Sequence, residues 1–414
     1  MLGPPSAPAT GQFVRLLAAL VLMSCLSQFY RVSNGVIAPE LMRELGLSPR
    51  QLGVAGGAFF LTLLIAQIPV GIWFDRHGAR ITLTLLSGFA VLGAVMVAAA
   101  TSANDLIIAR AVIGLGCAAN FMAVVVVLSR WVEPARYTTV LSWAFALSNL
   151  GTIAAATPLA WASNTMGWRA TFLVLAVISG LGALLFYAIV RDRPPGAPEP
   201  RPGAETMREV LAGLMTVWRT RGLAPVLAMH TFAYATQLTV LGIWAGPYLF
   251  DVHGLDGIAR GNVLLAMGLA QIVGVFSYGP LDRMAGSRRK VVIAGALLTM
   301  ATLIALAAIE APPLALAIGL LILVTFVASY GVVIVSQGRA LFPAHLAGRG
   351  ATTVNMAQLL GLMGLPVVTG IIINAFPQVG SVAPEIAYRA AFAALALGSL
   401  SGLLVYLRSA DSRP

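Results

Sequence analysis

Arg31 attracts attention first, because it lies within an apolar stretch, residues 13–33, that is long enough to cross a membrane. A charged side chain inside a bilayer costs from about 3 to more than 10 kcal/mol, so it needs a partner or a water-filled cavity. Three interpretations stay open. Arg31 contacts an anionic solute, or it extends its long side chain to the membrane surface, or it belongs to a structural pair.

The carboxylates are placed differently, since all fifteen fall in loops or near the ends of apolar stretches. No acid therefore lies at the depth of Arg31, and an anionic solute would relieve this uncompensated charge. Glu40 is the nearest acid and a candidate proton carrier at the outer mouth. His230 is a second candidate, because imidazole exchanges protons near neutral pH; hydrogen bonding within a helix bundle is the alternative.

Other polar and aromatic side chains also fall inside apolar stretches, where such groups usually face the interior of a helix bundle. They either line a solute path or hydrogen-bond neighbouring helices. The candidates for solute binding are Tyr30, Arg31, Asn34, Arg110, Asn149, Tyr234, Gln237, Trp244 and Gln358.

A different chemistry follows the second apolar stretch, where the chain reads Gly71-Ile72-Trp73-Phe74-Asp75-Arg76-His77-Gly78-Ala79-Arg80. The two glycines allow close helix contact, and the Asp75 carboxylate can hold Arg80 or cap a neighbouring helix. A charge pair that forms in one state and breaks in another is a conformational latch; a static loop clamp is the alternative. A shortened copy with Asp282 and Arg283 follows the eighth stretch.

This loop resembles the G-x-x-x-D-R-x-G-x-R signature of the major facilitator superfamily at every fixed position. The segment from Arg110 to Gly116 is similar to the same family's R-x-x-x-G-x-G motif. The resemblance implies two six-helix bundles, solute transport by alternating access, a latch role for the first loop, and a link between Arg110 and proton or solute coupling. For Arg110, an interfacial anchor after Asp105 is the alternative.

The segment from Phe29 to Asn34 resembles the first helix of the organic anion:cation symporters of that superfamily, which implies an anionic solute. Many proton-coupled relatives place an acid just before this arginine, or one to two turns after the fourth-helix arginine. Here Tyr30 and Cys117 occupy those places. The chain therefore departs from the family's pattern of carboxylate proton carriers.

The elements that must position these residues are apolar and numerous. Of the 414 residues, 59% are hydrophobic and 10% charged, whereas soluble domains carry about 25% charged residues. A membrane-spanning helix needs about 20 mostly apolar residues, so we predict an all-α membrane protein with twelve transmembrane helices. The apolar stretches are 13–33, 53–74, 81–100, 106–129, 138–162, 170–190, 224–248, 261–281, 291–309, 313–336, 351–375 and 388–407.

Positive charge is distributed unevenly between the connecting segments. With both termini cytoplasmic, 19 of the 26 basic residues fall on the inner side and 5 on the outer side. This bias predicts the orientation and explains the net charge of +11 without any nucleic-acid partner. We expect a multi-pass protein of the plasma membrane, specifically the bacterial inner membrane.

A Pro-rich, charged linker divides the chain into a first bundle over 1–190, a linker over 191–222 and a second bundle over 223–414. Apolar residues at helical spacing between Met207 and Trp218 predict an amphipathic helix on the inner membrane face.

The two halves echo each other. Asp282 follows Asp75 by 207 residues (282 − 75), and Pro366 follows Pro158 by 208 (366 − 158). Internal repeats of this kind are common among transporters, whose solute sites lie at the interface of the repeats.

Enzymatic chemistry has no basis in the sequence, which contains no phosphate-binding loop, metal-ligand cluster or nucleophile elbow. We therefore expect no catalysis, cofactor or metal. The prediction is a secondary transporter of a small solute, an anion moved with protons, that works as a monomer. A drug or metabolite efflux antiporter and a non-transporting membrane sensor or assembly protein are the alternatives, although residues 151–160 match the efflux pattern poorly.

Overall fold

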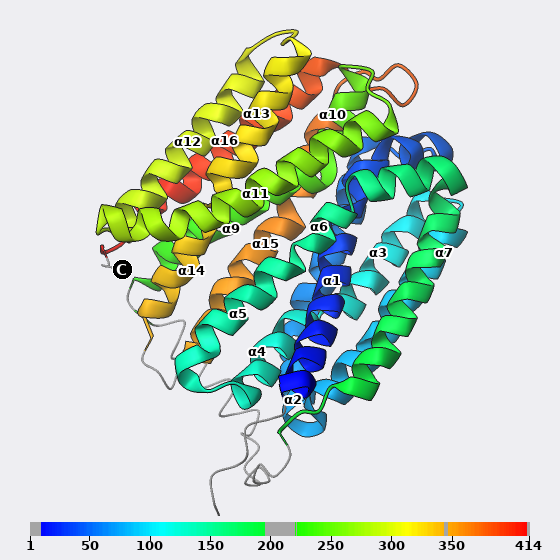
Figure 1. The fold of residues 1–414 in the computed structure, drawn as a ribbon. Coiled ribbons are helices and arrows are strands. Elements are labelled where there is room, and N and C mark those ends of the chain that lie inside the picture. The colour runs from blue at the N-terminus through cyan, green and yellow to red at the C-terminus, as the bar shows by residue number, and fades with distance from the viewer. Residues whose placement is uncertain (1–9, 195–219, 221, 343–346, 412–414) are drawn as a thin grey trace, which may run out of the picture.

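The computed structural model describes residues 10–194, 220, 222–342 and 347–411, and Figure 1 shows long helices running side by side. The described residues form no strand; Val379 and Val382 make one isolated antiparallel bridge. The predicted amphipathic helix between Met207 and Trp218 lies outside the described residues. In the first half the helices are α1 (Thr10–Leu45), α2 (Pro49–Ala99), α3 (Ala103–Cys117), α4 (Asn120–Trp131), α5 (Pro134–Ser148), α6 (Leu150–Ala154) and α7 (Thr157–Ile189).

The second half begins with a helix whose middle is π-helical. Its helices are α9 (Leu223–Thr239), the π-helix η1 (Val240–Trp244), α10 (Ala245–Asp251), α11 (Gly257–Ala285), α12 (Arg288–Ala308), α13 (Leu314–Val327), the 3-10 helix η2 (Ala328–Tyr330), α14 (Gly331–Ala340), α15 (Ala347–Asn374) and α16 (Glu385–Tyr406). In Figure 1 the helices α1 to α7 gather on one side, and α9, α11, α12, α13, α14 and α16 gather on the other.

Two of the longest helices are interrupted by glycines with positive φ. Gly78 (φ 76°, ψ 173°) breaks α2, and Gly167 (φ 81°, ψ 152°) breaks α7. Only glycine adopts such angles without steric cost. Each of these helices therefore consists of two segments that meet at its glycine.

The described residues contain eleven helical stretches long and apolar enough to cross a membrane. One of them, Thr139–Ile189, has 51 residues. At about 1.5 Å per residue it is more than twice as long as the ~30 Å hydrocarbon core is thick. Because it contains the break at Gly167, it supplies two crossings, and the total agrees with the predicted twelve. The all-helical membrane fold is confirmed.

Large apolar side chains cover the outward faces of these helices. Leu184, Phe276, Val273 and Leu397 are all more than half exposed. In water such a surface would aggregate, whereas in a bilayer it meets lipid chains while every backbone group is satisfied within its own helix.

The end of the molecule that holds residues 46–48 and 252–256 is called the outer end below, following the orientation that the charge distribution predicts. There, Glu44 of α1 accepts hydrogen bonds from Trp168 Nε1 at 2.9 Å and Arg169 Nη1 at 2.5 Å. Arg169 also donates to the carbonyl of Ala100 at 3.2 Å. This cluster joins α1, α7 and the end of α2.

The second half repeats this outer cluster with different side chains. Asp251 accepts a hydrogen bond from Tyr388 Oη at 2.5 Å, and Arg389 donates to the last turn of α12 at 2.7 Å. Asp251 follows Glu44 by 207 residues (251 − 44), and Tyr388 follows Trp168 by 220 (388 − 168). The internal repeat predicted from the sequence is therefore visible as a shared set of side-chain contacts.

Candidate functional site

Arg31 lies on α1 where this helix crosses the π-helix η1 of the second half. A Cβ atom added to Gly242 would lie 3.5 Å from the Arg31 carbonyl oxygen. The Arg31 side chain is half-buried, and its buried Nε has no hydrogen-bond partner among the described residues. The ion pairs of the described residues, three in all, do not include Arg31. An unpaired cation at this position needs water or an anion.

A polar face of α1 extends from Arg31 in both directions. Ser24, Ser27, Arg31 and Asn34 follow each other at spacings of three and four residues, so they lie on one side of the helix. Ser24 Oγ, Arg31 Nε and Asn34 Nδ2 are buried and have no hydrogen-bond partner among the described residues, and Ser27 lies beside the Cys117 thiol. Unsatisfied buried polar groups are rare in folded proteins. We call these four residues the α1 polar face.

Tyr30 points elsewhere, although the sequence predicts it as a solute contact. Its hydroxyl lies 2.8 Å from Ser179 Oγ on α7, within the first half. Its carbonyl oxygen accepts a hydrogen bond from Arg110 Nη1 at 2.7 Å. Tyr30 therefore fixes Arg110 and is left out of the solute contacts proposed below.

Arg110 is fully buried, so it is not an interfacial anchor. Its guanidinium carbon lies 4.9 Å from the centre of the Phe59 ring. Its Nε and Nη2 atoms are buried and have no hydrogen-bond partner among the described residues. Like the half-buried Arg31, it forms no ion pair with a carboxylate of the described residues.

Two predicted solute contacts of the second half are bonded within that half. Gln237 Nε2 donates to the Thr325 carbonyl and to Ser329 Oγ, the latter at 3.1 Å. Trp244 Nε1 donates to Thr369 Oγ1 at 2.7 Å. Both side chains are buried, and these bonds fix the packing of α9 and η1 against α13, η2 and α15.

The remaining predicted contacts, Asn149, Tyr234 and Gln358, are half-buried. The Asn149 amide donates to the Phe145 carbonyl at 2.9 Å. His230 is buried, and the Gln358 side chain lies within hydrogen-bonding reach of its ring. The structure therefore leaves three partly accessible polar side chains and one buried histidine as candidates.

Glu40, the candidate proton carrier at the outer mouth, forms an ion pair with Arg260 of α11. Arg260 is only 1% exposed, and its guanidinium carbon lies 5.1 Å from the Phe250 ring centre. Thr157 Oγ1 and Asn262 Oδ1 lie 2.9 Å apart nearby. These two contacts link the halves through polar side chains, and both lie at the outer end.

Glycines bring the two halves into backbone contact at the same end. An added Cβ at Gly53 of α2 would lie 2.2 Å from the Pro366 carbonyl oxygen of α15. An added Cβ at Gly261 of α11 would lie 3.1 Å from the Cα of Thr157, beside Pro158. Gly261 follows Gly53 by 208 residues (261 − 53), the same offset that separates the two prolines. These two crossings are equivalent in the two halves, and α1 makes a further close glycine contact with η1 and α10 at Gly35, Gly242 and Gly246.

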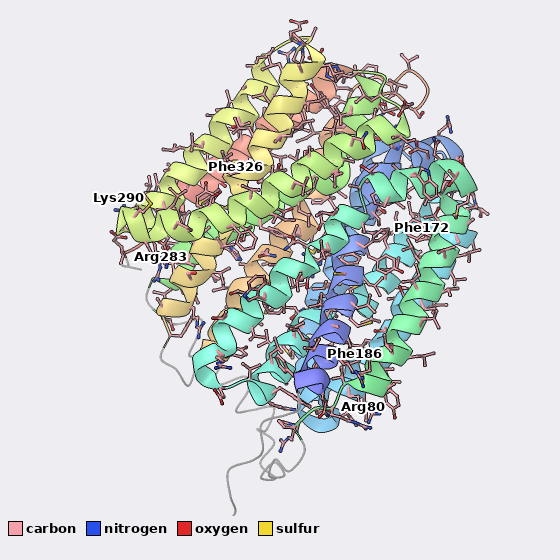
Figure 2. All side chains as sticks on the ribbon, in the orientation of Figure 1. Arg80, Phe172, Phe186, Arg283, Lys290 and Phe326 are labelled. Atoms are coloured by element: carbon pink, nitrogen blue, oxygen red, sulfur yellow. The ribbon has the colours of Figure 1, made fainter. Side chains whose placement is uncertain are left out.

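The predicted latch loop has a partner that the sequence analysis missed. Asp192 Oδ1 accepts hydrogen bonds from the backbone N–H groups of Ala79 at 2.6 Å and Arg80 at 3.0 Å, just after Gly78. Arg80 Nε donates to the Tyr187 carbonyl at 2.7 Å, and its guanidinium stacks 4.0 Å from the Tyr187 ring centre. Arg80 is therefore held against the end of α7 (Figure 2).

The other latch residues are less constrained. Gly71 has open space around it, so the close helix contact expected there is wrong, and Arg76 is exposed. The side chain of Asp75 lies outside the described part. Asp282 accepts a hydrogen bond from Arg288 at 3.4 Å, whereas Arg283 is exposed; Figure 2 shows Arg283 at the inner end of α11.

Asp411 has the same function in the second half as Asp192 has in the first. It accepts hydrogen bonds from Ser287 Oγ at 2.7 Å and the Arg289 N–H at 3.3 Å, and Arg289 Nη2 donates to the Leu407 carbonyl at 2.7 Å. One sequence signal could have identified the pair, since each acid lies within a few residues after the last helix of its half.

Comparison with known proteins assigns the family. The model of the Major Facilitator Superfamily matches residues 20–362. A putative tartrate transporter of Agrobacterium vitis is 25% identical over 70% of this chain and 68% of its own length. A probable sulfoacetate transporter of Cupriavidus necator is 27% identical over 58% of each chain. The hexuronate transporter of Bacillus subtilis is 24% identical over 57% of this chain and 56% of its own.

Solved structures share the fold across nearly the whole chain. A bacterial homologue of the human lysosomal transporter Spinster, in an inward-facing and unoccupied conformation, superposes with a TM-score of 0.75 at 17% identity, covering 96% of this chain and 95% of its own. A D-xylose–proton symporter gives a TM-score of 0.76 at 14% identity, covering 95% and 97%. With its twelve crossings, its matching loop signature and these relatives, the chain belongs to the Major Facilitator Superfamily of transporters.

Proposed function

We propose that the protein carries a small organic anion across the membrane by alternating access, with Arg31 as the anion contact. The observation that supports this most directly is the half-buried, unpaired Arg31 where α1 crosses η1. A solute bound there touches both halves, as an alternating-access carrier requires. Curated relatives named for tartrate, sulfoacetate and hexuronate support an anionic solute.

The solute class follows from the chemistry of the α1 polar face. A guanidinium binds a carboxylate or sulfonate through two parallel hydrogen bonds, and the unpaired Asn34 Nδ2 one turn further along supplies another donor. Asn149, Tyr234 and Gln358 remain candidates for contacts with the polar remainder of the solute. A small hydroxylated carboxylate or sulfonate fits this set of donors.

Proton coupling is part of the proposal. Opening the outer end must separate Glu40 from Arg260, and a protonated Glu40 loses its Coulombic attraction to Arg260. The buried His230 is the second candidate for proton binding. Neither group lies on the α1 polar face, so proton and solute would act through the relative motion of the two halves.

Uptake into proteoliposomes tests this function. Purified protein should accumulate at least one member of a panel of tartrate-like hydroxyacids, short sulfonates and uronates, and an inward proton gradient should increase the accumulation. Transport that ignores all acids but extrudes hydrophobic cations would instead favour the efflux antiporter. Absence of any flux in protein shown to be folded by thermal unfolding would favour a sensor or assembly role.

A further inference from the structure

Arg260 of α11 lies at the outer end with its guanidinium shielded from solvent. Its side chain is 1% exposed, and its guanidinium carbon lies 5.1 Å from the Phe250 ring centre. Among the described residues it forms one ion pair, with Glu40 of α1, and its buried Nε has no hydrogen-bond partner there. A guanidinium in such surroundings depends on its counterion, because a buried charge without one is costly.

The counterion of Arg260 belongs to the other half of the molecule. Glu40 lies on α1 in the first half, whereas Arg260 lies in the first turn of α11 in the second half. The two side chains must therefore separate when the outer end opens. Arg260 then lines the space between the halves through which an external solute has to pass, and its guanidinium has lost its carboxylate.

A small cavity beside this ion pair supplies further hydrogen-bonding groups. Its volume is about 30 Å³, which is room for about two water molecules. Ser163 and Asn164 of α7 line it together with Glu40 and Arg260. The buried Glu40 Oε2 atom has no hydrogen-bond partner among the described residues. The cavity wall thus places a hydroxyl and an amide, both able to donate to an oxyanion, on the side of the guanidinium where the carboxylate lies.

The other acids close to Arg260 are bound elsewhere. Asp251 lies within electrostatic range of Arg260, but its carboxylate accepts the hydrogen bond of Tyr388 Oη at 2.5 Å. Asp256 caps the N-terminus of α11 through a backbone N–H at 2.8 Å. Neither acid forms an ion pair with Arg260 in the described part of the chain. Glu40 is therefore the carboxylate that neutralises Arg260 while the outer end is closed.

We propose that Arg260 is an outer capture site for the organic anion, and that Glu40 occupies this site whenever the outer end is closed. The Glu40 carboxylate and the carboxylate or sulfonate of the solute bind the same planar fork of donors, so they compete for it. When the halves separate, the solute takes the place of Glu40 and is held with Ser163 and Asn164 before it reaches Arg31. This inference rests on the proposed function, because it takes the same class of solute.

Equilibrium binding to the purified full-length protein tests the capture site, with tartrate, sulfoacetate and glucuronate as probes. Glu40→Gln removes the competing carboxylate, so this variant should bind a second molecule of acid in addition to the one at Arg31. Glu40→Gln combined with Arg31→Gln should keep the binding at Arg260. Adding Arg260→Gln to this double variant should abolish it.

The same titrations separate the two proposals. If the folded double variant Glu40→Gln, Arg31→Gln binds none of the three acids, or if its binding survives Arg260→Gln, the capture site is overturned. The proposed function then still stands, provided that the parent protein shows binding that depends on Arg31. Binding that depends on Arg260 but never on Arg31 would support the capture site and contradict the solute contact at Arg31.

Initial rates of uptake into proteoliposomes give a second measurement, which leaves Glu40 in place. Arg260→Lys keeps the charge that pairs with Glu40 but loses the bidentate fork, so the KM for external acid should rise roughly 10-fold at an unchanged maximal rate. A role in closure alone would change the maximal rate instead. Arg169→Lys is the matched control, because Arg169 pairs with Glu44 at the same end but within the first half, and its KM should equal that of the parent protein. An Arg260→Lys protein with the KM of the parent would overturn the proposal.

Discussion

At the scale of single residues, Arg31 and Arg110 show how far sequence reasoning reaches. Both are recognisable in the sequence, because a charge inside an apolar stretch needs an explanation. Their surroundings are not recognisable, since the rotation of a helix about its axis depends on packing with helices far away in the chain. Because of that rotation, Tyr30 points towards α7, and Gln237 forms a hydrogen bond with α13. Both side chains therefore point away from the α1 polar face.

Substitutions of Arg31 should separate its charge from its shape. Lys retains the charge but loses the bidentate fork, and a hydrogen bond to a charged group contributes about 1.5–3 kcal/mol. We expect the solute affinity of Arg31→Lys to fall roughly 10- to 100-fold and that of Arg31→Gln to be almost abolished. Equilibrium binding of the transported acid measures both.

Arg43→Gln is the matched control, because Arg43 is an exposed arginine on the same helix. The affinity of this variant for the transported acid should equal that of the parent protein. If Arg31 only extended to the membrane surface, Lys would bind as well as Arg, and Gln would reduce the membrane-inserted yield without changing affinity.

At the scale of elements, the helices meet at glycines and are capped by acids from distant segments. Apolar stretches predict where helices lie, but they do not predict which glycine touches a neighbour. Gly53 lies against Pro366, whereas Gly71 and Gly88 have open space around them. Composition does not distinguish these three glycines, since each lies in the same kind of apolar surroundings.

Gly53→Ala should disturb the closed outer end. Its new Cβ would lie 2.2 Å from a backbone oxygen, and overpacking of this kind costs about 1–3 kcal/mol. Gly88→Ala, with no neighbour within 4 Å, should instead stabilise the helix by up to about 1 kcal/mol. Thermal unfolding measures both variants: the melting temperature should fall for Gly53→Ala and rise for Gly88→Ala. Equal changes in melting temperature would show that the α2–α15 crossing is not tight.

Asp192→Ala and Asp411→Ala should have matching effects, because each removes the acceptor that caps the helix after a loop. Loss of a cap costs about 0.5–2 kcal/mol. We expect each variant to lower the melting temperature by a similar amount and the double variant by about the sum. Asp256→Ala is the comparison, because Asp256 caps the N-terminus of its own helix, α11, at the outer end. Its change in melting temperature gives the contribution of a cap that comes from the same helix.

At the scale of the whole molecule, the contacts between the halves at the outer end include the Glu40–Arg260 ion pair, the Thr157–Asn262 contact and the glycine crossings at Gly53 and Gly261. The twelve crossings, the repeat and the loop signature could be predicted, because they follow from hydropathy and local motifs. Arg260 could not be assigned to Glu40, since 220 residues separate them (260 − 40). Such long-range pairs depend on the assembled fold and on its conformational state.

Glu40→Gln should favour opening of the outer end. Breaking a buried ion pair leaves Arg260 uncompensated at a cost of about 3–5 kcal/mol, reduced here because Glu40 is 30% exposed. A cysteine placed at Ser163, beside this pair, should react faster with an impermeant thiol reagent added from outside.

Glu44→Gln is the control, because Glu44 pairs with Arg169 inside the first half, and its labelling should match the parent. The exchanged pair Glu40→Arg with Arg260→Glu should restore slow labelling. Fast labelling in the exchanged protein would assign the closure to shape alone, without a contribution from the charges.

The π-helix η1 determines in which direction around the helix axis the side chains of the following helix, α10, point. A π-helical turn contains one residue more than an α-helical turn, and one residue corresponds to about 100° of rotation around the axis. The faces of α10 are therefore rotated by about that angle from where α9 would have placed them. Asp251 follows η1 on α10 and accepts the hydrogen bond of Tyr388 with this offset in place. A one-residue deletion within Val240–Trp244 would turn that carboxylate away, so the length of this segment is as much a determinant of the outer cluster as the residues that compose it.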